Sequence, residues 1–238
     1  MGTQALQRLA GNLYGTGRRQ RRNRCGVLLV LLIQACLINY VNMQRETVTT
    51  EQILEKKIAI TFDDGPNPDY TEMLLEGLAE REVCATFFLL GKEVEKYPDI
   101  VRDIYDEGHL IGTHAYEHVN LSNLNDKAAI EQVDRTNEAI KEITGESPEF
   151  IRPPFGCWKC NLDYETSMIE VLWDVDPLDW KTSNSDVITK RVVDKVEEND
   201  IILLHDASES SVVAAFKIID ALKKQGYTFV TVDEILFD

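Results

Sequence analysis

The sequence is poor in basic side chains, and those that it has are unevenly distributed. Seven of its 25 Lys and Arg residues, all of them Arg, precede Glu46, and no acidic residue does. The chain from Glu46 onward therefore carries 18 basic against 41 acidic side chains, a net charge of −23. Nucleic-acid binding needs a basic surface that neutralises phosphates, so this composition argues against nucleic acid as a partner. Neutral ligands such as sugars remain open.

The sequence also lacks internal repeats and low-complexity segments, and it has only four His and five Cys. A length of 238 residues without repeats predicts one globular domain of ordinary size preceded by a tail. Cys25 and Cys36 belong to an apolar N-terminal segment. Cys84 opens an apolar run, where we expect a buried free thiol.

The apolar N-terminal segment, CGVLLVLLIQACLINYV at 25–41, follows five closely spaced Arg residues. That arrangement favours a membrane-spanning helix with its basic end in the cytoplasm over a buried helix. We expect 1–24 to be a cytoplasmic basic tail, 25–43 a single-pass transmembrane signal-anchor and 44–56 a stalk. Residues 57–238 then form a domain on the outer side of the cell membrane.

The same segment is also compatible with two cleaved forms of the protein. It can be a signal peptide whose removal leaves a secreted domain, although no clean A-x-A cleavage site follows it. The sequence Ile33-Gln34-Ala35-Cys36 also resembles a lipoprotein cleavage box in which Gln34 fits poorly. Cleavage there leaves a lipid-anchored protein.

From Lys57 onward, short apolar runs alternate with amphipathic stretches. Residues at helical spacing, such as Ile130, Val133 and Ile140, lie between runs rich in β-branched and aromatic residues. This alternation predicts βα units around a parallel sheet or barrel. The predicted strands are 58–62, 84–90, 109–112, 150–151, 171–175, 201–204 and 228–232.

Polar clusters directly follow five of the seven predicted strands. In a parallel βα fold all strands point the same way, so these clusters converge at the carboxyl ends of the strands, where such folds place active sites. The clusters are Asp63-Asp64-Gly65-Pro66, His114 with His118, residues 152–156, residues 176–180, and His205-Asp206.

Each cluster is ordinary when it is taken alone. Asp, Gly and Pro form turns. His114 and His118, four residues apart, are expected on one face of a helical turn, and such a lone pair is more often a surface coincidence than a metal site. Together the clusters point to chemistry, because they contain three of the four His; we assign the fourth, His109, to structure. Two His and one Asp leave an open position for water, as catalytic zinc requires, and a second Asp can accept that water's proton.

Five short segments resemble the motifs of one known family. TFDDGP (61–66), HAYEH (114–118), RPPFG (152–156), DPLDW (176–180) and LLH (203–205) are similar to the five motifs of the NodB-homology polysaccharide deacetylases, carbohydrate esterase family four. They occur in the family's order, and the resemblance covers 57–238. It implies an α/β fold, a distorted (β/α) barrel with seven parallel strands, preceded in this chain by the transmembrane helix.

The resemblance also implies a role for each matching residue. One divalent metal, Zn²⁺ with Co²⁺ or Ni²⁺ as alternatives, is expected on Asp64, His114 and His118. The remaining implied roles are Asp63 as catalytic base, Arg152 as its holder, His205 as general acid, Asp179 as the residue that orients His205, the Phe155 N–H as an oxyanion donor, and Trp180 and Leu203 as walls of the groove and the acetyl pocket.

Two departures from the family pattern stand out. Ala115 occupies a position that is usually Ser or Thr, so a hydroxyl that braces the ligand loop is missing and metal binding is expected to loosen modestly. The family does not require the cysteines of CWKC, Cys157 and Cys160. In an oxidising exterior a local disulfide is the expected state, with a soft metal site or a redox pair as alternatives.

The expected function is hydrolysis of N-acetyl groups on an amino-sugar polymer. The outward-facing anchor favours peptidoglycan N-acetylglucosamine as substrate, with chitin oligomers and poly-N-acetylglucosamine as alternatives. An O-acetyl xylan esterase is the enzymatic runner-up. A catalytically silent, membrane-tethered sugar-binding module is the alternative from another class, but family members of that kind lose the base, a ligand or the acid, and none is lost here. The sequence gives no indication of the oligomeric state.

Overall fold

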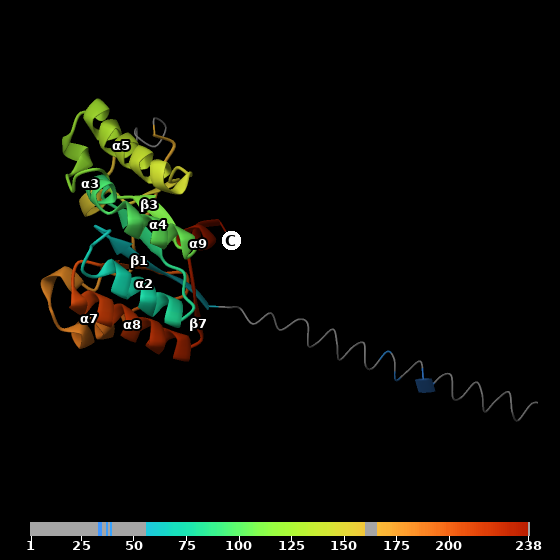
Figure 1. Cartoon of the computed structure of the whole chain (residues 1–238). Coiled ribbons are helices and arrows are strands. Elements are labelled where there is room, and N and C mark those ends of the chain that lie inside the picture. Colours follow the sequence, from blue (N-terminus) through green and yellow to red (C-terminus); the bar gives the residue numbers. More distant parts are fainter. Residues whose placement is uncertain (1–32, 35–36, 38, 40–55, 160–165, 238) are drawn as a thin grey trace, which may run out of the picture. The chain divides into compact units, whose positions relative to one another are not determined.

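The computed structural model describes residues 33–34, 37, 39, 56–159 and 166–237 (Figure 1). Residues Glu55–Asp238 form a compact unit of their own. In the part of the chain that is described, no helix has the length and apolar character needed to cross a membrane. The expected basic tail and nearly all of the expected transmembrane segment and stalk lie outside the described residues, so they stay predictions.

Seven parallel strands form one sheet in the described residues. Its order is β5-β4-β3-β2-β1-β6, and β7 pairs with β1. Ala59 in β1 pairs with both Ile201 of β6 and Val230 of β7, so β6 and β7 lie on opposite edges of β1. The strands are β1 Lys56–Asp63, β2 Thr86–Leu89, β3 Leu110–Thr113, β4 Phe150–Ile151, β5 Ile169–Glu170, β6 Ile201–His205 and β7 Tyr227–Val230.

Helices follow the strands, as the alternating sequence pattern predicts. Asn125 caps the longest one, because its side chain accepts from the Ala128 N–H, and Gly145 ends it with a φ of 88°. Pro98 starts a new helix and so divides the amphipathic stretch that follows β2. The helices are α2 Thr71–Glu80, α3 Gly91–Lys96, α4 Pro98–Asp106, α5 Asp126–Thr144, α7 Ser185–Val193, α8 Glu209–Lys224 and α9 Val232–Phe237, with short 3-10 turns η1 Leu121–Asn123, η2 Pro154–Gly156 and η3 Asp179–Lys181.

The core lies between the sheet and these helices. β1 and β2 are buried along nearly their whole length, which explains why both runs are continuously apolar. In Figure 1, α2, α7 and α8 gather beside β1 and β7, and α3, α4 and α5 gather beside β3. Because helices cover it, this sheet is rigid and can hold side chains in fixed positions at its carboxyl ends.

The predicted strand at 171–175 is wrong in its position. The fifth strand is β5, Ile169–Glu170, and Val175 makes only an isolated parallel bridge with Ile202. The reason lies in the hydrogen bonds of the segment, because the carbonyls of Val171 and Leu172 accept from the buried Arg152 guanidinium instead of from a neighbouring strand. The segment thus runs from the edge of β4 to the edge of β6, and the strands form an incomplete barrel.

Two residues beside β2 test smaller expectations. Cys84 is exposed, so the expectation of a buried thiol is wrong; the chain becomes strand-like only at Thr86. His109 is buried, and its Nδ1 accepts from the Ala85 N–H at 3.1 Å, so its assignment to structure is confirmed. Burial lowers the pKa of His109 to about 4, which keeps the ring neutral.

Candidate active site

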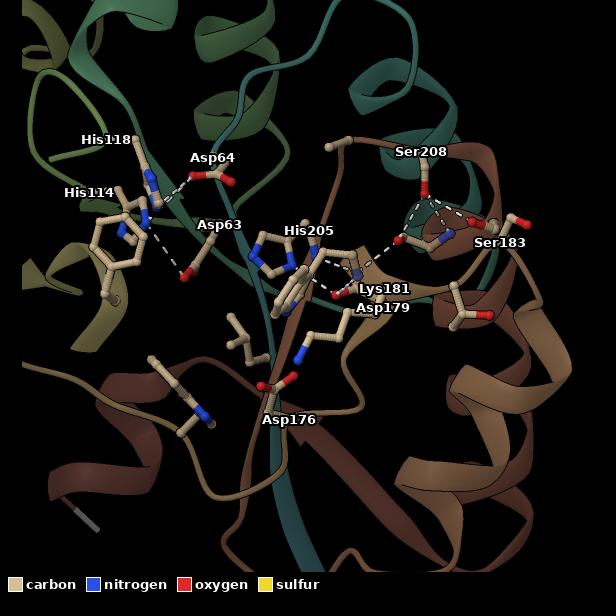
Figure 2. A pocket seen from close by; sticks show the side chains of 18 of the residues that line it. Asp63, Asp64, His114, His118, Asp176, Asp179, Lys181, Ser183, His205 and Ser208 are labelled. Atoms are coloured by element: carbon tan, nitrogen blue, oxygen red, sulfur yellow. Dashed lines mark hydrogen bonds and ion pairs between the residues drawn. The ribbon is translucent and has the colours of Figure 1, made fainter. Parts of the chain in front are cut away.

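One cleft of about 900 Å³ lies at the carboxyl ends of the strands (Figure 2). The convergence that the sequence predicts is therefore present, since residues from all five polar clusters line this cleft or contact residues that do. Its lining includes Asp63, Asp64, His114, His118, Phe155, Asp179, Trp180, Leu203 and His205.

Asp63 ends β1 and is held by a buried arginine. Arg152 Nη1 donates to Asp63 Oδ1 at 2.8 Å, and both side chains are almost fully buried. The same nitrogen donates to Thr61 Oγ1 at 2.6 Å. Because a buried charge is stable only when it is paired and hydrogen-bonded, the guanidinium fixes the Asp63 carboxylate in one orientation.

Asp64 turns away from Asp63 because the strand ends between them. A φ of 74° at Asp64 places this residue in the left-handed region, and the adjacent carboxylates therefore point to different partners. Gly65 follows, where a Cβ would lie 2.6 Å from the Asp206 carboxylate, so a larger residue would have to displace that buried side chain. The cis peptide bond between Gly65 and Pro66 completes the turn.

Asp64, His114 and His118 form a group that can hold a cation. One ligand atom from each lies within 4.8 Å of the other two. Asp64 Oδ1 is 3.5 Å from His114 Nε2 and 3.6 Å from His118 Nε2. Two ligands bound at about 2.1 Å to one tetrahedral ion stand about 3.4 Å apart, so these separations fit a shared metal.

Two further observations favour a metal over an ordinary hydrogen-bonded cluster. Asp64 Oδ1 is buried, and no hydrogen-bond donor among the described residues reaches it. His114 Nδ1 lies 2.6 Å from the Arg152 carbonyl, which can only accept, so Nδ1 carries the proton and Nε2 keeps its lone pair. Burial lowers the pKa of His114 and outweighs the opposing charges of Asp63 and Asp64, which also favours the neutral ring.

The expectation that the two His share a helical turn is wrong. Residues 114–118 form an irregular loop, in which Ala115 is fully buried and has a φ of 64°. Backbone hydrogen bonds to α3 hold the loop: the Gly91 N–H donates to the Ala115 carbonyl at 3.0 Å, and the Lys92 N–H donates to the Tyr116 carbonyl at 3.2 Å. These contacts brace the loop although the hydroxyl usual at position 115 is absent.

His205, at the end of β6, is hydrogen-bonded to Asp179 in η3. His205 Nδ1 donates to Asp179 Oδ1 at 2.8 Å, and the His205 backbone N–H donates to Oδ2 at 2.9 Å. Burial lowers the pKa of His205, but the hydrogen bond and the negative charge of Asp179 outweigh it and raise the pKa to about 9. The imidazole is therefore protonated at neutral pH. Its Nε2 takes no part in the hydrogen bonds to Asp179.

Three more predicted residues shape the cleft. Leu203 is buried in its wall, whereas the aromatic side chains of Phe155 and Trp180 are each 61% exposed. The Phe155 ring meets the His118 ring edge-on, with centroids 4.5 Å apart, and Phe155 has a φ of 63°. Exposed aromatic faces beside a polar centre form a surface on which a sugar ring can pack.

The structure describes one member of the cysteine pair. Cys157 Sγ lies 3.5 Å from the Phe155 carbonyl oxygen. Cys160 lies outside the described residues, so the expected disulfide stays a prediction.

Sequence reasoning assigned no role to three residues that support the site. Thr61 lies two residues before Asp63 and so on the same face of β1, a signal that the strand period could have given; it accepts from Arg152 and donates to the Ile202 carbonyl. Ser211 donates to Asp179 Oδ2 at 2.7 Å from the first turn of α8. Asp206 is buried beside Gly65 and accepts from the Thr71 hydroxyl. Burial raises the pKa of Asp206 to about 7.

Comparison with known proteins agrees with this geometry. The family model described as "Polysaccharide deacetylase" matches residues 50–171. A Bacillus subtilis relative, "Peptidoglycan-N-acetylmuramic acid deacetylase PdaC", is 40% identical over 192 residues, which make up 81% of this chain and 40% of the relative. A Bacillus cereus relative, "Peptidoglycan-N-acetylglucosamine deacetylase", is 41% identical over 182 residues, or 74% of this chain and 66% of the relative.

Solved structures show the same likeness in three dimensions. The structure of peptidoglycan deacetylase PdaC from Bacillus subtilis matches with a TM-score of 0.75 and 40% identity, and the match covers 77% of this chain and 91% of that one. The two relatives named above are longer proteins, of which this chain spans 40% and 66%.

Proposed function

This chain belongs to the polysaccharide deacetylase family, the NodB-homology fold of carbohydrate esterase family four, and on that premise we propose that it hydrolyses N-acetyl groups of peptidoglycan amino sugars. The proposal rests on the observation that two reactive groups face each other across one cleft. The carboxylate of Asp63, paired with Arg152, and a protonated imidazole, His205, lie on either side of an opening beside three candidate metal ligands. Amide hydrolysis needs a base and an acid in such positions.

We propose Asp64, His114 and His118 as the residues that hold a divalent cation. The unpartnered Asp64 oxygen and the two Nε2 lone pairs fit zinc, which takes nitrogen and oxygen ligands in this combination. A metal held there lowers the pKa of water and polarises a carbonyl when it is bound.

The residues of the chain then divide the proton transfers between them. Asp63 accepts a proton from the attacking water, and Arg152 holds the carboxylate toward the cleft; a base so placed contributes about 10²–10⁴ in rate. The Phe155 N–H donates to the oxyanion as charge develops on it. His205 gives its proton to the departing amine nitrogen, and Asp179 stabilises the charged imidazole until that transfer. Acetate and a free amino sugar are the products.

The alternatives differ in substrate more than in chemistry. Peptidoglycan is favoured over chitin-type and poly-N-acetylglucosamine oligomers because both relatives are named as peptidoglycan deacetylases. One is named for N-acetylmuramic acid and the other for N-acetylglucosamine. N-acetylglucosamine and N-acetylmuramic acid are both candidate units, since each is named for one of these relatives, and an O-acetyl xylan esterase can use the same groups. A silent sugar-binding module is disfavoured, since base, ligand set and acid are all retained.

Location outside the cytoplasm is part of the same proposal. A polymer of the cell wall is reached only there, and the apolar segment at 25–43 after five Arg can anchor the domain on the outer face of the membrane. A secreted or lipid-anchored form after cleavage serves the same purpose.

Acetate release tests the proposed function directly. The zinc-loaded protein should release acetate from peptidoglycan and not from O-acetylated xylan. A chelator should abolish the release, and added zinc should restore it. Acetate release from xylan alone would show that the protein is an O-acetyl xylan esterase. Acetate release that survives full metal removal would refute the metal-dependent mechanism.

A further inference from the structure

One lysine stands out in a cleft that is otherwise rich in acids. Lys181 is the one Lys or Arg among the described residues that line the cleft. Figure 2 shows its side chain extending into the cleft on the side of His205 and Asp179, away from the His114–His118 pair. Its Nζ lies over the Trp180 ring, 4.2 Å from the centroid.

Apart from Asp176, whose Oδ1 accepts from the Leu178 N–H, the other charged side chains of the cleft have partners with a defined purpose. Asp63 is paired with Arg152, Asp179 is paired with His205, and Asp64 faces the two candidate histidine ligands. Lys181 by contrast makes no ion pair with any described carboxylate. Its charge is therefore available to a ligand that enters the cleft.

The backbone that carries Lys181 is fixed before any ligand binds. Asp176 Oδ1 accepts from the Leu178 N–H at 2.7 Å, and the Lys181 N–H donates to the Leu178 carbonyl at 3.1 Å. Arg191 Nη1 also donates to the Pro177 carbonyl at 2.7 Å. A cation on a fixed loop and a supporting ring loses less conformational entropy on binding than one on a mobile side chain.

The overall charge of the protein disfavours an acidic substrate unless a local cation offsets it. The chain from Glu46 onward has a net charge of −23, which repels an anionic polymer at long range. At short range a lysine in the cleft can offset that repulsion only where a carboxylate of the substrate comes within reach. A neutral amino-sugar polymer offers this lysine hydrogen-bond acceptors but no opposite charge.

We propose that Lys181 is a specificity-determining residue that binds a carboxylate of the substrate, so that the cleft selects acidic amino-sugar polymers over neutral ones. This inference rests on the proposed function. In an N-acetylmuramic acid unit the lactyl ether is on the carbon next to the one that bears the N-acetyl group. Its carboxylate therefore lies near the amine that His205 protonates, on the same side of the cleft as Lys181. A stem peptide attached to the lactyl group is a second source of carboxylates.

Three tetrasaccharides of equal length separate the effect of substrate charge from that of chain length. They also distinguish lactyl carboxylates from peptide carboxylates. The first is neutral, with four N-acetylglucosamine units. The second alternates N-acetylglucosamine with N-acetylmuramic acid and carries free lactyl carboxylates. The third is the same chain with stem peptides attached, so that its carboxylates belong to the peptides. Calorimetric Kd values, measured without turnover, should be roughly tenfold lower for a carboxylate-bearing chain than for the neutral one.

Four variants identify the residue. Lys181→Gln should remove the roughly tenfold preference, mainly by weakening binding of the acidic chains, whereas Lys181→Arg should retain it. Asp176→Asn removes a like charge beside the ligand, keeps the loop hydrogen bond to Leu178, and should strengthen binding of the acidic chains. Lys195→Gln, on an exposed position outside the cleft, changes the net charge equally and should leave the preference intact.

Each outcome decides the proposal. A preference that falls with added salt and disappears in Lys181→Gln supports it, and the arm that shows the preference identifies the lactyl or peptide source. A wild-type protein without preference, or an equal preference in Lys181→Gln, overturns it. Because binding is measured without turnover, failure to release acetate from any of the three chains counts against the proposed function, whereas the role of Lys181 is decided by the Kd values alone.

Discussion

The two sides of the cleft differ in how many of their polar atoms find partners within the protein. On the acid side, His205, Asp179 and Ser211 form a closed hydrogen-bonded set. On the metal side, Asp64 Oδ1 lies 3.5 Å from His114 Nε2 and 3.6 Å from His118 Nε2. These distances are too long for strong hydrogen bonds. A buried Asp64 oxygen has no donor among the described residues.

This difference indicates which side depends on a ligand. The acid side is organised by folding, because both Asp179 carboxylate oxygens and His205 Nδ1 have partners within the protein. The metal side leaves an acceptor buried, which costs free energy unless a cation satisfies it. Four substitutions probe this contrast, beginning with the one for which we expect the largest effect.

Asp63→Asn removes the base on the metal side without removing a ligand. We expect kcat to fall by about 10²–10⁴ because Asn cannot accept the proton from water. Zinc affinity, measured by competition with a chromophoric chelator, should stay unchanged, since the Asn oxygen still accepts from Arg152. Asp69→Asn, an exposed change of equal charge on the adjacent loop, is the matched control. Activity within tenfold of wild type would show that Asp63 is not the base.

Arg152→Met tests the stability of the metal side in the absence of metal. The buried guanidinium donates to Asp63, Thr61, and the carbonyls of Val171 and Leu172. Its loss leaves the Asp63 carboxylate buried and unpaired, so the free energy of unfolding should fall by about 3–5 kcal/mol in urea titrations. Adding Asp63→Asn to Arg152→Met should recover part of the loss. Additive effects of the two changes would contradict a direct pairing.

Asp179→Asn breaks the acid side alone. The pKa of His205, held at about 9 against an ordinary 6.5, should fall, because the Asp179 charge that favours the imidazolium is gone. The alkaline limb of kcat/KM should therefore move to lower pH. The stabilisation that protonation of His205 gives, complete below pH 6.5 and lost between 6.5 and about 9, should disappear.

Ser211→Ala is the matched control for the acid side. It deletes one hydrogen bond to Asp179 and keeps the carboxylate charge. It should therefore shift the alkaline limb of the kcat/KM profile less than Asp179→Asn does. An NMR titration of the His205 ring measures the pKa directly in both variants. An unchanged pKa in Asp179→Asn would contradict the assigned cause.

Ala115→Ser should have the smallest effect. The loop of His114 and His118 is already held by backbone hydrogen bonds from Gly91 and Lys92. A restored hydroxyl should therefore change zinc affinity by less than about threefold, below the 10–100-fold typical of groups that hold a ligand directly. A tenfold tightening would mean that the missing hydroxyl, and not the backbone contacts, limits metal binding.

Much of the fold and the site could be predicted from the sequence because their signals are local. Continuous apolar runs identify β1, β2 and β6, and polar residues directly after them mark the carboxyl ends of the strands. The strand predicted at 171–175 failed for a nonlocal reason, since Arg152, about 20 residues earlier, binds the carbonyls of that segment. The helical turn expected between His114 and His118 failed because Ala115 adopts a left-handed conformation.

Residue type and hydrophobic period are properties of the chain, and they are enough to say which chemical groups this protein has and near which strand ends they stand. Which groups meet depends on the folded molecule: Arg152 holds Asp63, Ser211 completes the Asp179 pair, and Lys181 faces the cleft. The first two contacts join residues tens of positions apart. Their distances depend on how strands and helices pack, and no local pattern encodes that packing.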